Sequence, residues 1–300
     1  MTIHVSQKLL RLAARSDFSS FLRMVVATVS PAARYQHNWH IDAIAAHLDA
    51  CAKGDIRRLI INMPPRMLKS ITVSVAWPAW LLGQDARTRV MVASYAQSLS
   101  IKHSTDCRLV MQSPWYRAIF PQTELAYDQN EKEKFVTTLR GHRIATSVGG
   151  SATGEGGNIL IVDDPLNPLQ AQQRSMREAA NQWFDHTFAT RLDDKKHGAI
   201  VVVMQRLHAE DLSGHLLKKK GWDLLSLPAI AMSRNAIFYG KFSKIREVGD
   251  VLHAAREDAM ILEQVKRELG SANFNAQYQQ APLGEDEGMI KLSWFGRFVL

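Results

Sequence analysis

The residues best suited to chemistry lie where an apolar run ends and an apolar helix is expected to begin. Residues 59–63 read LIINM, are rich in β-branched side chains and stop at Pro64-Pro65, which predicts a buried strand followed by a turn. Residues 70–82 are again apolar and predict a helix. Because free N–H groups at a helix start attract phosphate, Lys69 could reach the β- and γ-phosphates of a nucleotide. The Ser70 hydroxyl would ligate Mg²⁺.

This segment departs from the phosphate-loop pattern GxxxxGK[ST] at both glycines. Met63 and Leu68 occupy the two glycine positions. Glycine before the lysine lets the backbone wrap the phosphate closely or adopt a positive φ. Leu68 therefore either strains the loop or marks a backbone that stays in an allowed region. On these eight residues alone, an ordinary strand–turn–helix connection is an equal alternative.

Two adjacent carboxylates follow a second apolar run. Residues 159–162 read ILIV, which predicts a buried strand, and Asp163-Asp164-Pro165 comes directly after it. Open α/β sheets bind ligands at the carboxyl ends of their strands. Asp163 would hold Mg²⁺, directly or through water, and Asp164 would activate the attacking water as a general base. Asp-Asp-Pro can also simply start a turn, but together with the phosphate loop it favours a nucleotide hydrolase.

Alternating strands and helices are expected to position these residues. Further strands are predicted at 89–94 and 199–204, helices at 97–112 and 170–192, and a hairpin over 134–148. The predicted fold class is α/β: a P-loop NTPase with a mostly parallel central sheet flanked by helices, plus a smaller, mainly helical C-terminal subdomain. The expected division is an N-terminal helical segment at 1–50, an ATPase core at 51–210 and a helical or linker subdomain at 211–300.

Composition sets looser bounds. The chain has 300 residues and a formal net charge of +8, which is compatible with a polyanionic partner such as DNA but decides nothing. Cys51 and Cys107 stand alone, so neither a zinc site nor a disulfide framework is implied. No apolar run approaches the roughly 20 residues that span a bilayer. We therefore expect a cytoplasmic protein without membrane contact.

Four segments, in this order, resemble the large terminase subunits of tailed bacteriophages, the ATP-driven motors that package DNA into procapsids. The first is PPRMLKS at 64–70, similar to the family's PPRxGKS loop. A glycine-rich stretch at 149–157 then leads into ILIVDDP. The segment VMQRLHAEDLSG at 203–214 looks like the family's coupling segment, and FNAQYQQAP at 274–282 looks like the stretch that closes its ATPase region.

The resemblance implies a set of site residues. ATP and Mg²⁺ are the expected cofactors, and the ATP-binding residues would be Pro65, Arg66, Met67, Leu68, Lys69 and Ser70, with Gln36 and Trp39, next to Tyr35, at the adenine. Catalytic roles fall to Asp164, Lys69 and Arg66, the last stabilising charge on the γ-phosphate. Gln205 and Arg206 would couple hydrolysis to movement. Arg108, Arg140 and Arg143 are equal candidates for an arginine supplied to a neighbouring subunit.

The same resemblance implies partners and a location. These are double-stranded DNA, a portal protein, a small terminase subunit and copies of the chain itself in a ring on the portal, in the cytoplasm of a bacterial host. The family's nuclease domain is expected to be absent, because only 18 residues follow Pro282 (300 − 282). We therefore expect ATP hydrolysis without DNA cleavage by this chain alone.

Three residues depart from the family pattern and keep alternatives open. Leu68 replaces the loop glycine, Gln205 replaces a threonine that helps sense the γ-phosphate, and Leu207 replaces an aromatic residue. Gln205 can still donate and accept hydrogen bonds. One alternative is a catalytically impaired terminase fragment, from a decayed prophage or a split gene, that acts as an assembly protein. Another is a different P-loop translocase acting on nucleic acid.

Overall fold

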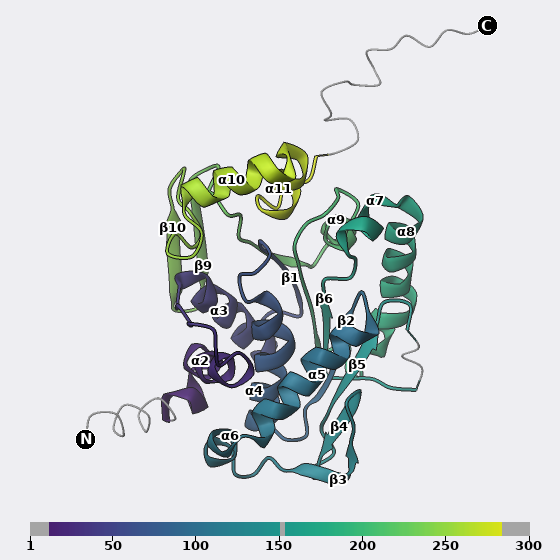
Figure 1. Ribbon diagram of the computed structural model, residues 1–300. Coiled ribbons are helices and arrows are strands. Elements are labelled where there is room, and N and C mark those ends of the chain that lie inside the picture. The colour runs from purple at the N-terminus through teal and green to yellow at the C-terminus, as the bar shows by residue number, and fades with distance from the viewer. Residues whose placement is uncertain (1–11, 151–153, 284–300) are drawn as a thin grey trace, which may run out of the picture.

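An eight-stranded sheet forms the centre of the molecule (Figure 1). The computed structural model describes residues 12–150 and 154–283, and within them the strand order is β3-β4-β5-β2-β6-β7-β1-β8. Six neighbouring strands run parallel, from β5 to β8 in this order, while β4 and β3 continue the sheet antiparallel. The strands are β1 (Arg58–Asn62), β2 (Arg89–Ser94), β3 (Leu125–Asn130), β4 (Lys134–Thr137), β5 (His142–Ser147), β6 (Ile159–Asp163), β7 (Ala199–Met204) and β8 (Asp223–Ser226). The mostly parallel α/β sheet predicted from the sequence is confirmed.

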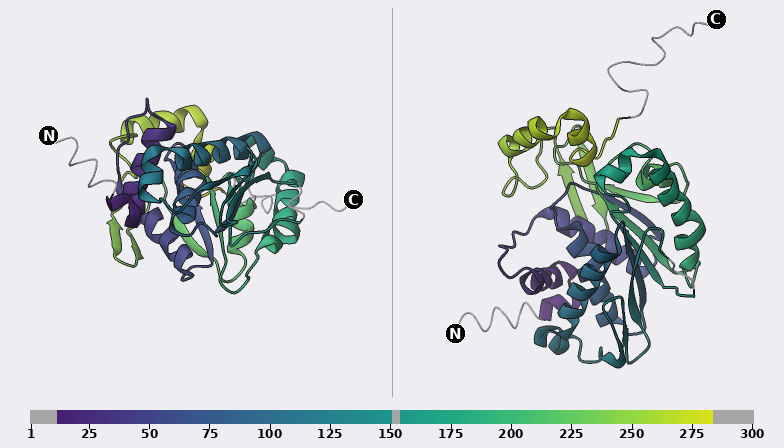
Figure 2. Two further views of the ribbon diagram at one scale, coloured as in Figure 1. Left: turned by 90° about the horizontal axis from the view of Figure 1, so that it is seen from below. Right: turned by 45° about the vertical axis from the view of Figure 1, so that its right-hand side comes forward.

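Helices cover both faces of this sheet (Figure 2). One face packs against α2 (Phe18–Val29), α3 (Trp39–Lys53), the π-helical segment η1 (Ile71–Ala76), α4 (Trp77–Gln84), α5 (Gln97–Gln112) and α6 (Pro114–Ile119). The other face packs against α8 (Arg174–Trp183), η2 (Phe184–Phe188), the 3₁₀ turn η3 (Ala189–Arg191) and α9 (Leu212–Leu217), with α7 (Pro168–Gln172) preceding α8. The helix predicted at 97–112 and the antiparallel hairpin predicted within 134–148 are both present.

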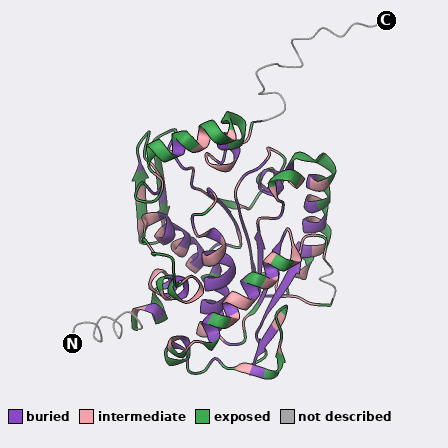
Figure 3. Ribbon diagram, viewed as in Figure 1, coloured by how far each residue is buried: buried purple, intermediate pink, exposed green. Residues whose placement is uncertain are grey.

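Successive residues of the central strands pack alternately into two separate hydrophobic cores. Ile61 and Ile161 belong to the core beneath α2–α6, whereas their neighbours Ile60 and Leu160 lie in the core beneath α8–α9. Together the two cores bury the central strands, as Figure 3 shows for the middle of the sheet. This explains why the parallel strands read as continuous apolar runs.

The pairing of β7 with its two neighbouring strands shows where the predicted site residues lie. Asn62 at the end of β1 pairs with Met204 of β7, and Asp163 at the end of β6 pairs with Val203 on the other side of the same strand. The loop after β1 and the carboxylates after β6 therefore emerge at one edge of the sheet, on either side of β7. This is the edge at which open α/β sheets bind ligands.

The part after residue 210 differs from the prediction of a mainly helical subdomain. It holds α9, α10 (Ala259–Leu269) and α11 (Ser271–Gln277), but also β8 and the hairpin of β9 (Asn235–Tyr239) and β10 (Phe242–Arg246). Because β8 pairs with β1, a boundary at 210 falls inside the central sheet. The hairpin packs beside α3 (Figure 1). Among the described residues, no helix is long and apolar enough to cross a membrane.

Candidate nucleotide-binding site

The loop between β1 and η1 has an unusual backbone. Arg66 and Leu68 adopt positive φ values of 62° and 65° on either side of Met67. A left-handed residue next to a right-handed one can turn successive N–H groups into a concavity that binds anions. Leu68 therefore has the left-handed conformation that glycine normally adopts. Of the two alternatives that the sequence left open for Leu68, the structure has the strained loop.

Leu68→Gly is expected to strengthen nucleotide binding by a few-fold. A left-handed leucine costs about 1–2 kcal/mol, which glycine avoids, although glycine also loses more entropy when the loop orders. Titration of a fluorescent ATP analogue against both proteins measures the change. Leu81→Gly, in the middle of α4, is the control and should only destabilise the fold. Weaker binding by Leu68→Gly would show that the leucine side chain, which packs on the core, matters more than the strain.

The first carboxylate of the pair is held by two serine hydroxyls. Ser70 Oγ donates to Asp163 Oδ1 at 3.0 Å, and Ser74 Oγ donates to Asp163 Oδ2 at 2.7 Å. Asp163 is fully buried, and burial raises the pKa of its carboxyl, an effect that Lys69 and the two hydroxyls oppose. His103 Nδ1 lies 3.5 Å from Asp163 Oδ2, and burial lowers the pKa of this imidazole to about 4, so the ring is neutral at pH 7.

The second carboxylate contacts the loop lysine. Lys69 Nζ lies 2.8 Å from Asp164 Oδ2, and both side chains are largely buried. Burial alone would lower the pKa of Lys69, but the carboxylates of Asp164 and Asp163 outweigh it and raise this pKa. The backbone N–H of Gln205 donates to Asp164 Oδ1 at 3.2 Å. Asp164 also has a strained φ of 46°, which is common at active sites.

The oxygen donors of this cluster suit Mg²⁺. A serine hydroxyl and a carboxylate, Ser70 and Asp163, lie in mutual contact at the mouth of the phosphate loop. Mg²⁺ prefers hard oxygen ligands and is usually bound by one or two protein groups together with substrate phosphates. The described residues contain no group of three or more His, Cys, Asp and Glu side chains that could hold a metal ion.

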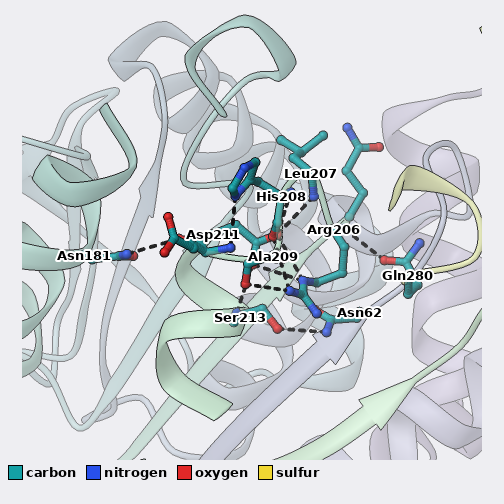
Figure 4. Close-up of polar contacts among 12 residues, drawn as sticks. Asn62, Asn181, Arg206, Leu207, His208, Ala209, Asp211, Ser213 and Gln280 are labelled. Atoms are coloured by element: carbon teal, nitrogen blue, oxygen red, sulfur yellow. Dashed lines mark hydrogen bonds and ion pairs between the residues drawn. The ribbon is translucent and has the colours of Figure 1, made fainter. Parts of the chain in front are cut away.

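The segment after β7 forms a buried ion-pair loop (Figure 4). Arg206 Nε lies 3.0 Å from both oxygens of Asp211. The same carboxylate accepts hydrogen bonds from the backbone N–H groups of Leu207, His208 and Gly214, and so caps α9. The backbone N–H of Arg206 donates to Gln280 Oε1 at 2.9 Å, which ties the segment to the QYQQ motif. Gln205 and Arg206 are thus brought next to Asp164 and to the C-terminal part.

The two residues predicted to contact adenine lie in different places. Gln36 lines a small cavity beside the loop, together with Tyr35, His40, Met67 and Leu68. Trp39 instead faces the hairpin, with Lys244 Nζ 5.8 Å and the Arg246 guanidinium carbon 5.5 Å from its ring centroid. It lines a separate hollow with that hairpin. Gln36 therefore lies beside the loop, whereas Trp39 packs against the hairpin through cation–π contacts.

One of the three candidate arginines for a neighbouring subunit is ruled out. Arg143 is fully buried, and its Nη2 donates to the carbonyl of Ser74 at 3.1 Å, so it cannot reach another subunit. Arg140 is exposed, in the turn before β5, and Arg108 is half-buried with Nη1 donating to the carbonyl of Asn130. The glycine-rich stretch at 149–157 lies partly outside the described residues.

Sequence reasoning missed Ser74 and His103, which contact Asp163 from η1 and α5. Ser74 lies four residues after Ser70, so both hydroxyls share one side of a helix. That spacing is the signal that could have identified Ser74. Nothing in the local sequence of α5 marks His103.

No protein-family model matches the chain, and no curated protein matches it in sequence. Solved structures do match in fold. The HK97 bacteriophage large terminase has a TM-score of 0.53 at 13% identity, covering 86% of this chain and 54% of its own. The ATPase domain of the Thermus phage P74-26 large terminase, a mutant form, has 0.54 at 10% identity, covering 83% of this chain and 95% of its own.

The large terminase of a thermophilic bacteriophage has a TM-score of 0.51 at 10% identity, covering 86% of this chain and 57% of its own. The chain thus spans little more than half the length of that protein and of the HK97 protein, and nearly all of the separate P74-26 ATPase domain. At these identities the likeness concerns the fold. This chain has the fold of the ATPase domain of phage large terminases.

Proposed function

We propose that this chain is an ATP-hydrolysing motor subunit that drives double-stranded DNA into a procapsid. The observation that carries the proposal is the pairing of the two motifs: Ser70 of the loop contacts Asp163, and Lys69 contacts Asp164. Residues from opposite sides of β7 meet in this way only if the loop and the acidic strand end form one site. Together with the fold, this favours nucleotide hydrolysis over an ordinary strand–turn–helix connection.

In the proposed site, the loop from Pro65 to Ser70 cradles the triphosphate of ATP through its N–H groups. Lys69 leaves Asp164 to contact the β- and γ-phosphates, and the exposed Arg66 reaches the γ-phosphate. Ser70 and Asp163 would hold Mg²⁺, which neutralises phosphate charge when bound. Asp164 then accepts a proton from the attacking water. Gln36 contacts the base from the cavity beside the loop.

Coupling to movement is proposed for Gln205 and Arg206. The backbone N–H of Gln205 contacts the general base, and the next residue is clamped by Asp211 and Gln280. A change in Asp164 on hydrolysis would therefore act directly on a segment that contacts the C-terminal part of the chain. DNA contacts would be made mainly to the phosphate backbone, because packaging must tolerate every sequence.

The proposed partners are double-stranded DNA, a portal protein, a small terminase subunit and further copies of this chain in a ring. The proposed location is the cytoplasm of a bacterial host. The net charge of +8 is compatible with the DNA contact. Arg108 and Arg140 remain the candidates for an arginine supplied to the neighbouring site, since neither is fully buried.

A second candidate function is an assembly protein that keeps the fold and has lost turnover. The observation that favours it is the left-handed Leu68, which strains the loop at the residue before Lys69. In that case the chain would bind a portal or a small terminase subunit without consuming ATP.

The ATPase rate of the purified chain, with and without double-stranded DNA, separates these functions. We expect measurable turnover that DNA stimulates, and a loss of about 10–100-fold in Lys69→Ala, because hydrogen bonds to charged groups are worth about 1.5–3 kcal/mol. Lys53→Ala, which removes an exposed lysine at the end of α3, is the matched control. Equal low ATPase rates for wild type, Lys69→Ala and Lys53→Ala would contradict the motor function and favour the assembly function.

A further inference from the structure

Arg143 of β5 is a buried cation for which the proposed function has no use. Its side chain is 0% exposed, behind the candidate site rather than at its surface. Nη2 donates to the Ser74 carbonyl, but Nε and Nη1 have no hydrogen-bond partner among the described residues. An unpaired buried guanidinium is costly, so a nearby charge is expected to compensate it.

The compensating charge is Asp163. The acidic groups near Arg143 are Cys107, Asp163 and Asp106. Burial raises the pKa of the Cys107 thiol to about 12, so this group is neutral, and Asp106 is already paired with Lys102. Asp163 is fully buried and has no arginine or lysine in direct contact among the described residues. Asp163 is therefore the acidic group near Arg143 that is left to compensate it, while Lys69 and Arg143 both act on Asp163.

A missing N–H explains how Arg143 reaches the helix that follows the loop. In a regular helix the Ser74 carbonyl would accept from the residue four positions on, but that residue is Pro78, which has no N–H. The helix widens here into η1, where the N–H of Trp77 bonds to the Thr72 carbonyl five residues back. Pro78 cannot donate to the Ser74 carbonyl, and Arg143 Nη2 donates to it at 3.1 Å.

Ser74 then connects Arg143 to the metal-binding groups. The same serine accepts from Arg143 through its carbonyl and donates to Asp163 Oδ2 through its hydroxyl, at 2.7 Å. Asp163 in turn accepts from Ser70, the other proposed Mg²⁺ ligand. Arg143 thus acts on the metal-binding carboxylate in two ways: by its charge, and by fixing the backbone that carries Ser74.

We propose that Arg143 is a positioning residue that, through Ser74, holds Asp163 in the orientation needed for Mg²⁺ binding. This inference rests on the proposed function, because it assigns a role within the same site. Partners behind a metal ligand typically change metal affinity by about 10–100-fold when they are removed. Arg143 does not touch the nucleotide, so its removal should change metal dependence and not metal-free nucleotide affinity.

The test is an Mg²⁺ titration of fluorescent ADP binding to the full chain, compared with binding in EDTA. Arg143→Met removes the charge and every donor while keeping an unbranched apolar chain. We expect the half-saturating Mg²⁺ concentration to rise about tenfold or more, with binding in EDTA unchanged. Arg143→Lys keeps the charge and should recover part of the shift. Electron paramagnetic resonance of Mn²⁺ with ADP measures metal binding directly. It should show metal affinity falling from wild type to Arg143→Lys to Arg143→Met.

Arg246→Met is the matched control, because Arg246 is also buried and also donates to backbone carbonyls, those of Pro228 and Asp250. It should lower thermal stability without shifting the Mg²⁺ titration. A wild-type Mg²⁺ dependence in Arg143→Met would overturn the proposal. So would an equal loss of binding in EDTA, or the same Mg²⁺ shift in Arg246→Met, since either result would indicate a general packing role.

Nucleotide-free crystal structures of wild type and Arg143→Lys provide a second test, one that does not depend on nucleotide binding. We expect the 2.7 Å contact between Ser74 and Asp163 to lengthen or break in the variant. An unchanged contact, with Asp163 in place, would overturn the inference even if Arg143→Met does not fold. If the wild-type chain binds no nucleotide, the proposed function fails, and this second test still decides the role of Arg143.

Discussion

Asn in place of Asp164 is expected to lower ATP turnover by about 10²–10⁴-fold while ATP still binds, because a positioned general base contributes about that much. The amide keeps the oxygen that accepts from the Gln205 N–H, so the loop after β7 should stay in place. Single-turnover hydrolysis and fluorescent-nucleotide binding measure the two effects separately.

The geometry predicts more than a loss of rate. Lys69 Nζ lies 2.8 Å from Asp164, so nucleotide must draw the lysine away from the carboxylate before it can contact phosphate. The base becomes available only when a triphosphate holds Lys69. In Asp164→Asn this ion pair is gone, and we expect ATP to bind more tightly than to wild type.

Asp163→Asn is the comparison that separates the two carboxylates. It keeps an oxygen near Ser70 and Ser74 but removes the charge that Mg²⁺ needs, so it should weaken Mg²⁺-dependent binding rather than turnover alone. Near wild-type turnover in Asp164→Asn would contradict the role of Asp164 as the base.

The sequence was most informative where chemistry and burial coincide. Parallel strands buried on both faces give apolar runs such as ILIV, and the following Asp163-Asp164 is conspicuous because buried carboxylates are rare. The edge at which loop and carboxylates meet follows from parallel strand direction alone. These features made the sheet and the core of the site predictable.

What the sequence could not decide depends on the backbone or on distant residues. The positive φ of Leu68 is visible only in the structure, because the same side chain fits both alternatives that the sequence left open. Arg143 reads as an ordinary basic residue in the sequence, and only the structure shows that it is buried and donates to the Ser74 carbonyl. The cations that lie over Trp39 come from a hairpin about 200 residues later, which no local pattern could predict.

The strands missed after residue 210 have a simpler cause. β8 is a short edge strand with Leu224 45% exposed, so it lacks the apolar run of the central strands. In the hairpin, Ile237 is buried while Phe238 is 66% exposed. Apolar and polar residues alternate on either side of the turn at Gly240, and this alternation could have predicted the hairpin. The polar, helix-like pattern before it favoured the prediction of a mainly helical part instead.

Asp211→Asn is expected to destabilise the fold by about 3–5 kcal/mol, because removing one partner leaves a buried charge without compensation. Asp211 is fully buried, and its carboxylate accepts hydrogen bonds from Arg206 and from three backbone N–H groups at once. The neutral amide can accept only part of this set, and its NH₂ group would face the donors of Arg206. For a chain of this size the loss corresponds to roughly 10 °C in Tm, measured by thermal or urea unfolding.

The control is Asp49→Asn, which breaks an exposed ion pair with Lys53 and should change stability by less than about 1 kcal/mol. The double variant Arg206→Met with Asp211→Asn should lose less stability than the sum of the single variants, since no buried cation is then left unpaired. Additive losses would show that Asp211 acts only as the cap of α9. In that case the clamp on Arg206 would be too weak to transmit a change from Asp164 to Gln280, and the proposed coupling path would have to run elsewhere.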